Sequence, residues 1–213
     1  MSFFAFLRDN ARWLGGGFFL FLFSSFGQTF LISLSAGDIR RDYGLSHGGF
    51  GSLYMAATLL SALTLPRLGH IVDRYSARQV SFIVVPMLAL ASAVMALSHH
   101  IVLLFVAVYL LRLFGQGMMT HTAFTFMARW FSAQRGRAIS MATLGLNTGE
   151  ALLPLGFVAL SAWLGWRNAW WLAAASLLLV GLPLIASLLA VERTARAGDP
   201  PPRVNHVPDW TRA

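Results

Sequence analysis

The sequence contains no cysteine and no lysine, and it has few charged residues of any kind. Without cysteine, the chain can form no disulfide, no thiolate metal site and no cysteine nucleophile. Charged residues make up 11% of the 213 residues, whereas a soluble domain carries about 25%. The chain is instead 57% hydrophobic, with a mean hydropathy of +0.65. This composition is typical of a membrane protein.

The basic residues are all arginine and give the chain a formal net charge of +8. They lie between apolar runs and form no patch, so we expect a lipid bilayer, and no nucleic acid, as the partner. No His-Glu-x-x-His, Gly-x-Ser-x-Gly or Walker pattern is present, so the sequence does not predict an enzyme. The adjacent His99 and His100 have no further ligands nearby in the sequence, so no metal or cofactor is expected.

The chain contains six apolar runs, and each is long enough to cross about 30 Å of hydrocarbon as a helix. The predicted helices cover residues 13–35, 48–68, 80–97, 101–127, 138–163 and 169–190. Together they predict an all-α transmembrane domain over residues 1–190. The polar segment 37–44 is expected to be an external connection, and Gly48, Gly49 and Gly51 are expected to permit close packing of the second helix.

The arginines are distributed unevenly along this topology. Twelve of the sixteen fall in the connections and ends that lie on one side, three fall on the other side, and Arg112 alone lies within a helix. Because positive residues accumulate on the cytoplasmic side, both termini are predicted to be cytoplasmic. We therefore expect a multi-pass protein of the inner (plasma) membrane.

The tail, residues 191–213, differs from the rest of the chain. It contains the run Pro200-Pro201-Pro202 and has no apolar periodicity, which predicts an extended, solvated cytoplasmic linker.

The connection between the second and third apolar runs carries a distinctive pattern. Gly69, then Asp73-Arg74, then Arg78 follow one another with three residues in each gap. This pattern resembles the signature loop of the major facilitator superfamily of secondary transporters. The resemblance implies that Gly69 allows close helix approach and that the loop acts as a conformational latch on the cytoplasmic side.

The resemblance also implies an architecture. The chain is similar to the N-terminal half of a twelve-helix transporter, with six helices in a three-plus-three inverted repeat. Its last residues, 209–213, resemble the approach to a seventh helix in monocarboxylate and oxalate–formate carriers. The linker is then expected to lead to a missing C-terminal half, and the chain is expected to pair with such a half or with a second copy of itself.

Arg112 is the first candidate site residue. It lies about 25 Å along the helix from Arg129 and about 16 Å from Ile101, so it should lie deep in the membrane. An arginine at such depth usually faces a cavity or a partner. Arg112 followed by Gly115 and Gly117 also resembles the fourth-helix motif of the superfamily, in which the arginine is associated with proton coupling or an anionic substrate. The alternative is an arginine that reaches outward to the membrane surface.

Glu150 is the only carboxylate inside a predicted helix, at a depth that overlaps that of Arg112. We expect the two to share a central cavity, with Glu150 as the ion partner of Arg112 or as a proton carrier; a purely structural ion pair is the alternative. Gln28, Gln116 and Asn147 are further candidates for substrate or coupling contacts. Thr29 and Tyr54 could line the same polar path, and Gly145 and Gly149 have a helix-packing spacing.

The sequence thus predicts a secondary active transporter that moves a small solute, with a small organic anion and a coupled proton as the expected cargo. A symporter and an antiporter are both compatible with it. The alternatives are a membrane-embedded protein that acts by binding or assembly without transport, and an inactive half of a transporter.

Overall fold

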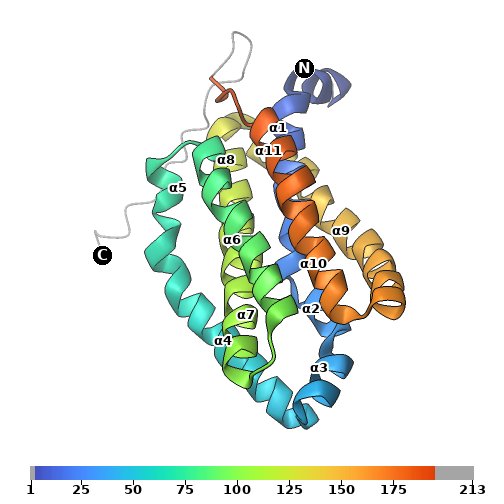
Figure 1. The fold of residues 1–213 in the computed structure, drawn as a ribbon. Helices are drawn as coiled ribbons and strands as arrows, with labels where there is room; N and C mark the ends of the chain where they lie inside the picture. Colours follow the sequence, from blue (N-terminus) through green and yellow to red (C-terminus); the bar gives the residue numbers. More distant parts are fainter. Residues whose placement is uncertain (1–2, 195–213) are drawn as a thin grey trace, which may run out of the picture.

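The computed structural model describes residues 3–194, and the regular structure in that range is entirely helical (Figure 1). Within this range, six spans are long and apolar enough to cross a membrane. They are Phe3–Leu34, His47–Arg74, Ala77–Leu97, Ile101–Trp130, Ser132–Leu164 and Trp166–Leu188. Their number and order confirm the predicted all-α membrane fold, and we call them the first to the sixth span.

Several spans consist of more than one helical element. The first three and their connections contain α1 (Phe3–Ser24), the 3₁₀ turn η1 (Ser25–Gly27), α2 (Thr29–Leu34), α3 (Ala36–Tyr43), α4 (His47–Gly69), α5 (Ile71–Arg74) and α6 (Ala77–Leu97). The last three contain α7 (Ile101–Leu111), the π segment η2 (Arg112–Met119), α8 (Thr120–Trp130), the 3₁₀ turn η3 (Ser132–Gln134), α9 (Arg135–Leu164), α10 (Trp166–Ser176), the π segment η4 (Leu177–Gly181) and α11 (Leu182–Leu188).

The ends of the bundle differ in what they carry. The start of α1 and the end of α11 lie at one end, which we call the terminal end, and α3 lies at the other, the distal end (Figure 1). The first helix begins at Phe3, ahead of the predicted residue 13, because its lead is packed against the bundle. Phe6 is buried there, and its ring meets that of Phe131 edge-on, with centroids 5.6 Å apart.

The connection between the first and second spans is also helical. Residues 37–44 were expected to form a polar connection, and most of them form α3, whose Ile39 is fully buried. Gly44 follows with φ at +63°, in the left-handed region that glycine adopts most easily, and this ends the helix. The segment is therefore a short amphipathic helix that rests on the distal end of the bundle.

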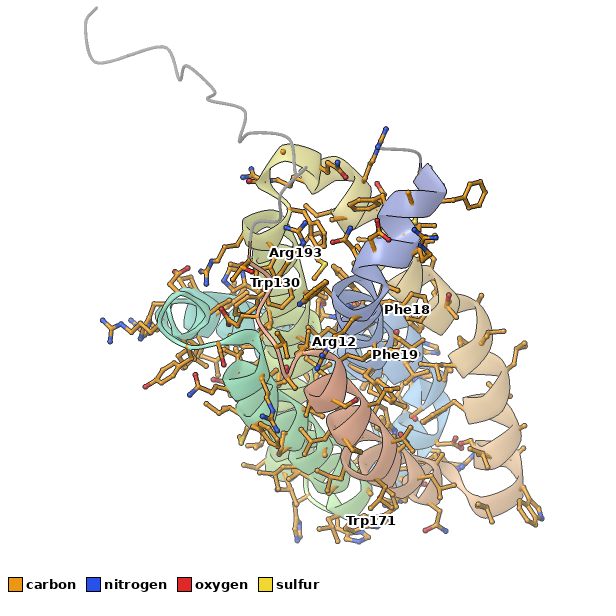
Figure 2. All side chains as sticks on the ribbon, turned by 90° about the horizontal axis from the view of Figure 1, so that it is seen from above. Arg12, Phe18, Phe19, Trp130, Trp171 and Arg193 are labelled. Atoms are coloured by element: carbon orange, nitrogen blue, oxygen red, sulfur yellow. The ribbon has the colours of Figure 1, made fainter. Side chains whose placement is uncertain are left out.

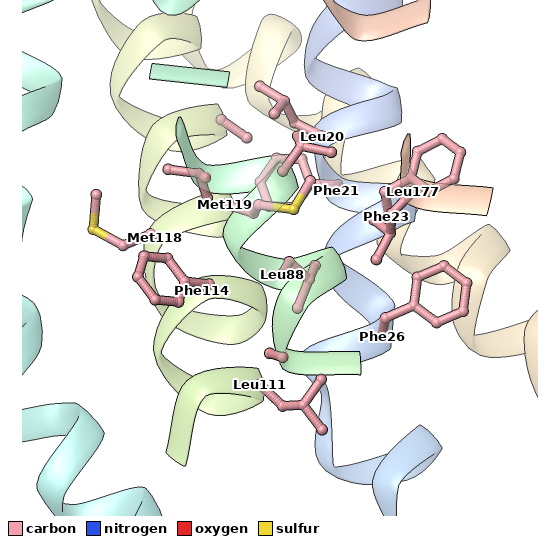
Figure 3. Packing of buried hydrophobic residues seen from close by; sticks show 14 of the residues in the cluster. Leu20, Phe21, Phe23, Phe26, Leu88, Leu111, Phe114, Met118, Met119 and Leu177 are labelled. Atoms are coloured by element: carbon pink, nitrogen blue, oxygen red, sulfur yellow. The ribbon is translucent and has the colours of Figure 1, made fainter. Parts of the chain in front are cut away.

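α1 lies at the centre of the bundle and packs against α8, α9 and α11 (Figure 1). α6 packs against α7 and α10 on another side. Figure 3 shows the interior between these layers, where Leu20 and Phe21 of α1 lie near Leu88 of α6 and Met119 of η2. The core is therefore apolar and contains long, branched and aromatic side chains.

Glycines bring α1 and η1 close to two other spans. A Cβ atom added to Gly115 of η2 would lie 2.5 Å from the Cα atom of Gly27 in η1. A Cβ atom on Gly145 of α9 would overlap the carbonyl oxygen of Phe18, and one on Gly149 would overlap the hydroxyl of Ser25. The spacing of Gly145 and Gly149 therefore does serve helix packing, with backbone in direct contact.

The second and fifth spans have the most exposed side chains, and they lie on opposite flanks of the bundle (Figure 2). Only Ala57 and Ser61 of α4 are buried. Large apolar side chains are exposed along both helices: Met55, Leu59, Leu60 and Leu63 on α4, and Leu144, Leu152, Leu155, Val158 and Trp163 on α9. The expected close packing at Gly51 is absent from the described residues, because nothing lies within 4 Å of a Cβ atom there.

At the terminal end, Arg12 and Arg193 form hydrogen bonds that join segments far apart in the sequence (Figure 2). Arg12 of α1 donates to the carbonyl oxygens of Ser187 and Leu188, the last residues of the sixth span. Arg193 donates to the carbonyl oxygen of Trp130 at 2.6 Å and to Asn10 of α1 at 3.0 Å. The segment that follows the sixth span is thus held against the bundle up to residue 194, and the rest of the predicted linker lies outside the described residues.

Candidate functional site

Arg112 is the first residue of η2, in the middle of the fourth span, and its exposed fraction is 7%. Its Nη1 donates to the hydroxyl of Thr29 at 3.0 Å and to the carbonyl oxygen of Gly27 at 3.4 Å. Its guanidinium carbon lies 5.6 Å from the centroid of the Tyr54 ring, within the range of a cation–π interaction. The predicted burial of an arginine at this depth is therefore present in the structure, and the side chain points into the bundle.

The backbone around Arg112 is irregular in both helices that meet there. The first span is interrupted at Gln28, whose φ and ψ are −82° and 153°, between the end of η1 and the start of α2. Opposite this interruption, the fourth span forms the π segment that begins at Arg112. π segments inside helices often occur at functional sites, and interrupted helices in transporters often form binding sites.

A cavity lies beside the interruption. It has a volume of about 390 Å³, is open on one side, and is lined by Gln28, Thr29, Phe30, Leu146 and Glu150. Glu150 comes from α9, whereas the three neighbouring residues come from the break in the first span. The cavity therefore contains one carboxylate, one amide and one hydroxyl, which could bind a small polar solute.

The predicted ion pair between Arg112 and Glu150 does not form in this structure. Neither residue has an ion-pair partner within 4 Å among residues 3–194, and Nε of Arg112 is buried without a hydrogen-bond partner. Thr29 lies between the two predicted groups, since it accepts from Arg112 and also lines the cavity of Glu150. Arg112 and Glu150 were predicted to meet because they lie at similar depths on two helices. Similar depth alone does not bring two side chains into contact.

The remaining predicted site residues divide into two groups. Gln28 lines the cavity with Glu150, whereas Gln116 and Asn147 are exposed and do not belong to its lining. Tyr54, which was expected to line the same polar path, contacts Thr29, and its hydroxyl donates to the hydroxyl of Thr29 at 2.9 Å. Its polarity pointed to the path, but its contact with Arg112 depends on the placement of α4.

The signature loop lies at the terminal end. Asp73 of α5 forms an ion pair with Arg129 of α8 at 3.0 Å, and Arg129 also lies over the ring of Phe126. A Cβ atom on Gly69 would lie 3.4 Å from Nε2 of His121, an ordinary contact, so the described residues do not require glycine at that position. The acidic residue of the loop therefore contacts the fourth span.

The two arginines of the loop are both exposed. Arg78, at the start of α6, lies 5.6 Å from the ring centroid of Phe82 on the same helix. Arg74 ends α5. Their charges therefore remain accessible at the terminal end.

A second polar cluster, which we did not predict, connects three segments at the distal end. Asp42 of α3 accepts from Arg167 at 2.5 Å and from the indole of Trp166 at 3.1 Å. Arg167 also donates to the carbonyl oxygen of Ser98, and Tyr43 donates to the hydroxyl of Ser98. The hydrogen bond from Arg167 holds the pKa of the Asp42 carboxyl below its ordinary value of 3.8.

The fold agrees with a comparison at the level of protein families. Residues 17–210 match the family described as Major Facilitator Superfamily. No curated protein matches the chain. No group of three or more His, Asp or Glu side chains suited to a metal ion occurs within residues 3–194. With six apolar spans, the loop of Asp73 and a family match over most of its length, the chain belongs to the major facilitator superfamily.

Proposed function

We propose that this chain forms half of the path of a secondary transporter and that its cargo is a small organic anion bound near Arg112. The observation that carries the proposal is a buried guanidinium with an unpartnered Nε and no carboxylate partner among the described residues. An uncompensated charge inside a membrane costs at least about 2.5 kcal/mol, so such residues are usually functional. A bound anion would supply the missing countercharge.

Glu150 is proposed as the proton-coupling group. It lies in the cavity next to Thr29, so a proton on its carboxylate would reduce repulsion against an anionic solute in the same space. A carboxylate that gains and loses a proton as the solute binds would link uptake to the pH gradient. Gln28 shares the cavity and is proposed to contact the solute through its amide.

The exposed flanks support a partner for this chain. The apolar side chains of α4 and α9 lie on both sides of the central helices α1 and α8, and a second six-helix half could cover them. Alternating access requires two halves that rock about a shared site, and a second copy of this chain is the other candidate partner. The same surfaces would also serve a protein that acts by assembly without transport.

Orientation and latch form a further part of the proposal. Exposed arginines gather at the terminal end, including Arg8, Arg135 and Arg137, so we place this end in the cytoplasm. We assign the chain to the inner (plasma) membrane on the same basis. The ion pair of Asp73 with Arg129 would then hold the signature loop against the fourth span on the cytoplasmic side.

The test is uptake of radiolabelled lactate, pyruvate, oxalate and formate into proteoliposomes with an imposed pH gradient. The chain is tested alone and joined to a six-helix partner half. Arg112→Ala should lower kcat/KM by at least about 30-fold, because loss of a buried charged contact costs 2 kcal/mol or more. Arg135→Ala, at an exposed arginine, is the control and should keep full uptake. Normal uptake by Arg112→Ala would contradict the proposed site, and no uptake in any preparation would favour assembly without transport.

Proton coupling is tested separately with Glu150→Gln. This variant should take up the solute equally well with and without the pH gradient, because the amide cannot carry the proton. The measurement is initial uptake at several external pH values. A variant that keeps the pH dependence of the parent protein would remove Glu150 from the coupling mechanism.

A further inference from the structure

Thr29 is the point at which three spans meet. It is the first residue after the interruption at Gln28, and its hydroxyl is reached by side chains from the second and fourth spans. Nη1 of Arg112 lies 3.0 Å from its oxygen, and the hydroxyl of Tyr54 lies 2.9 Å from the same oxygen. Both groups donate to it. The interruption is therefore what brings this hydroxyl between a buried cation and a tyrosine.

The two donors determine what the Thr29 hydroxyl can do next. A guanidinium can only donate, and a hydroxyl oxygen has two lone pairs and one proton. With both lone pairs occupied by Arg112 and Tyr54, the hydroxyl can form a further hydrogen bond only as a donor. Donation into its oxygen also polarises the O–H group, which strengthens the bond that it donates.

Thr29 connects the buried Arg112 with the cavity. Thr29 is exposed and lines the cavity that contains Gln28 and Glu150, whereas Arg112 is buried and its Nε is inaccessible. A solute that enters the cavity therefore contacts Thr29, whereas Arg112 is not part of the cavity lining. Arg112 therefore affects a solute in the cavity in two ways: by its hydrogen bond to the Thr29 hydroxyl, and by the electrostatic attraction of its positive charge.

We infer that Thr29 donates a hydrogen bond to a carboxylate oxygen of the solute, and that Tyr54 is a positioning residue that fixes the direction of this donation. The inference rests on the proposed function and makes it more specific. A hydroxyl restricted to donation selects solutes with acceptor oxygens, such as carboxylates, over solutes that offer only donors, such as ammonium ions.

The test compares variants of Thr29 and Tyr54 that each lose one hydroxyl group, with uptake of radiolabelled lactate, pyruvate, oxalate and formate as the readout. Thr29→Val removes the hydroxyl at constant shape and should raise KM about 10-fold for the solute that is taken up. Thr29→Ser keeps the hydroxyl and should stay within about 3-fold of the parent KM. Tyr54→Phe keeps the ring over Arg112 but removes the phenolic donor, and should raise KM about 3-fold.

The double variant separates positioning from independent binding. If Tyr54 acts through the Thr29 hydroxyl, Thr29→Val with Tyr54→Phe should have the KM of Thr29→Val alone. Multiplication of the two single effects would contradict the positioning role. If Thr29→Val fails to fold, judged by tryptophan fluorescence during heating, Tyr54→Phe decides the question, and an unchanged KM in that variant overturns the inference.

The chain offers a matched control. Tyr109 of α7 donates to the hydroxyl of Thr64 in α4 at 3.1 Å, the same pair of residue types in a bond between two spans. Tyr109→Phe should therefore leave KM unchanged. The outcomes also distinguish this inference from the proposed function. Loss of uptake in Arg112→Ala with parent KM in Thr29→Val would retain the arginine site and reject Thr29. Normal uptake in Arg112→Ala would reject the site itself.

Discussion

The first and second spans have a similar apolar composition but very different surroundings. Both are apolar, both are of membrane length, and both contain clustered glycines. Gly16 and Gly17 of the first span are buried, and Cβ atoms there would meet Leu189 and Met127. Gly51 of the second span has nothing within 4 Å of a Cβ atom. The first span is the centre of the bundle, whereas the second lies on its flank.

The difference shows what composition does and does not determine. Both helices are apolar and long enough to span the membrane, so both are compatible with lipid. Packing between helices in lipid depends on where small residues allow backbone contact, since lipid tails are as apolar as leucine. The first span has such contacts at Gly27, through Gly115, and at Phe18, through Gly145. The second span is held partly by two tyrosine–threonine hydrogen bonds.

The largest expected effect is at the contact of the first span with the fourth. Gly115→Ala places a methyl group 2.5 Å from the Cα atom of Gly27, where only backbone is available to move. Overpacking of this kind costs about 3 kcal/mol or prevents folding. The measurement is thermal unfolding followed by the fluorescence of the seven tryptophans. Unchanged stability would mean that the first span can move away from the fourth without cost.

An intermediate effect is expected at α3, which joins the first span to the second. Asp42→Asn weakens the contact with Arg167 and should lower the stability by about 1 kcal/mol at neutral pH. Because folding lowers the pKa of Asp42, its contribution is present above pH 4 and is lost as the pH falls through the lowered pKa. The stability difference between parent and variant should therefore be constant above about pH 5 and shrink in acid.

The control for this prediction lies on the same helix. Asp38 pairs with Arg41 three residues later on α3, so this pair joins two residues of one helix and no second span. Asp38→Asn should change the stability by at most about 0.5 kcal/mol. Equal effects at Asp38 and Asp42 would show that α3 is not held by the Arg167 contact.

The smallest expected effect has the opposite sign. Gly51→Ala in the second span meets no neighbour in the described structure and lies within a helix. The substitution should stabilise the chain by about 0.5 kcal/mol, because alanine loses less backbone entropy than glycine on folding. Thermal unfolding of the chain alone and joined to a partner half gives the comparison. Destabilisation in the joined protein only would place the partner against Gly51.

The six spans could be predicted because long apolar runs are visible in the sequence. The interruption of the first span could not be predicted in this way. Gln28 and Thr29 are not helix breakers, and no proline lies nearby. The interruption lies where Gly27 contacts Gly115 of another span, so it depends on tertiary structure. The π segment at Arg112 has no sequence signature for the same reason.

The sequence predicts how deep Arg112 and Glu150 lie in the membrane, but not the direction in which their side chains point. Counting residues at 1.5 Å each placed Arg112 and Glu150 at similar heights. In the structure, Arg112 donates to Thr29, and Glu150 lines the same cavity as Thr29. The count contains no information on the rotation of each helix about its axis, which decides whether two side chains meet. The cluster around Asp42 was missed because its members come from three connections that are far apart in the sequence.

The hydrogen bonds of Arg12 and Arg193 join residues that are synthesised at very different times. Arg12 is translated near the start of synthesis, but its acceptors, Ser187 and Leu188, are translated near the end of the described chain. Arg193 comes later still and returns to Asn10 and Trp130. The hydrogen bonds that join the first span to the end of the sixth can therefore form only after all six spans have been synthesised.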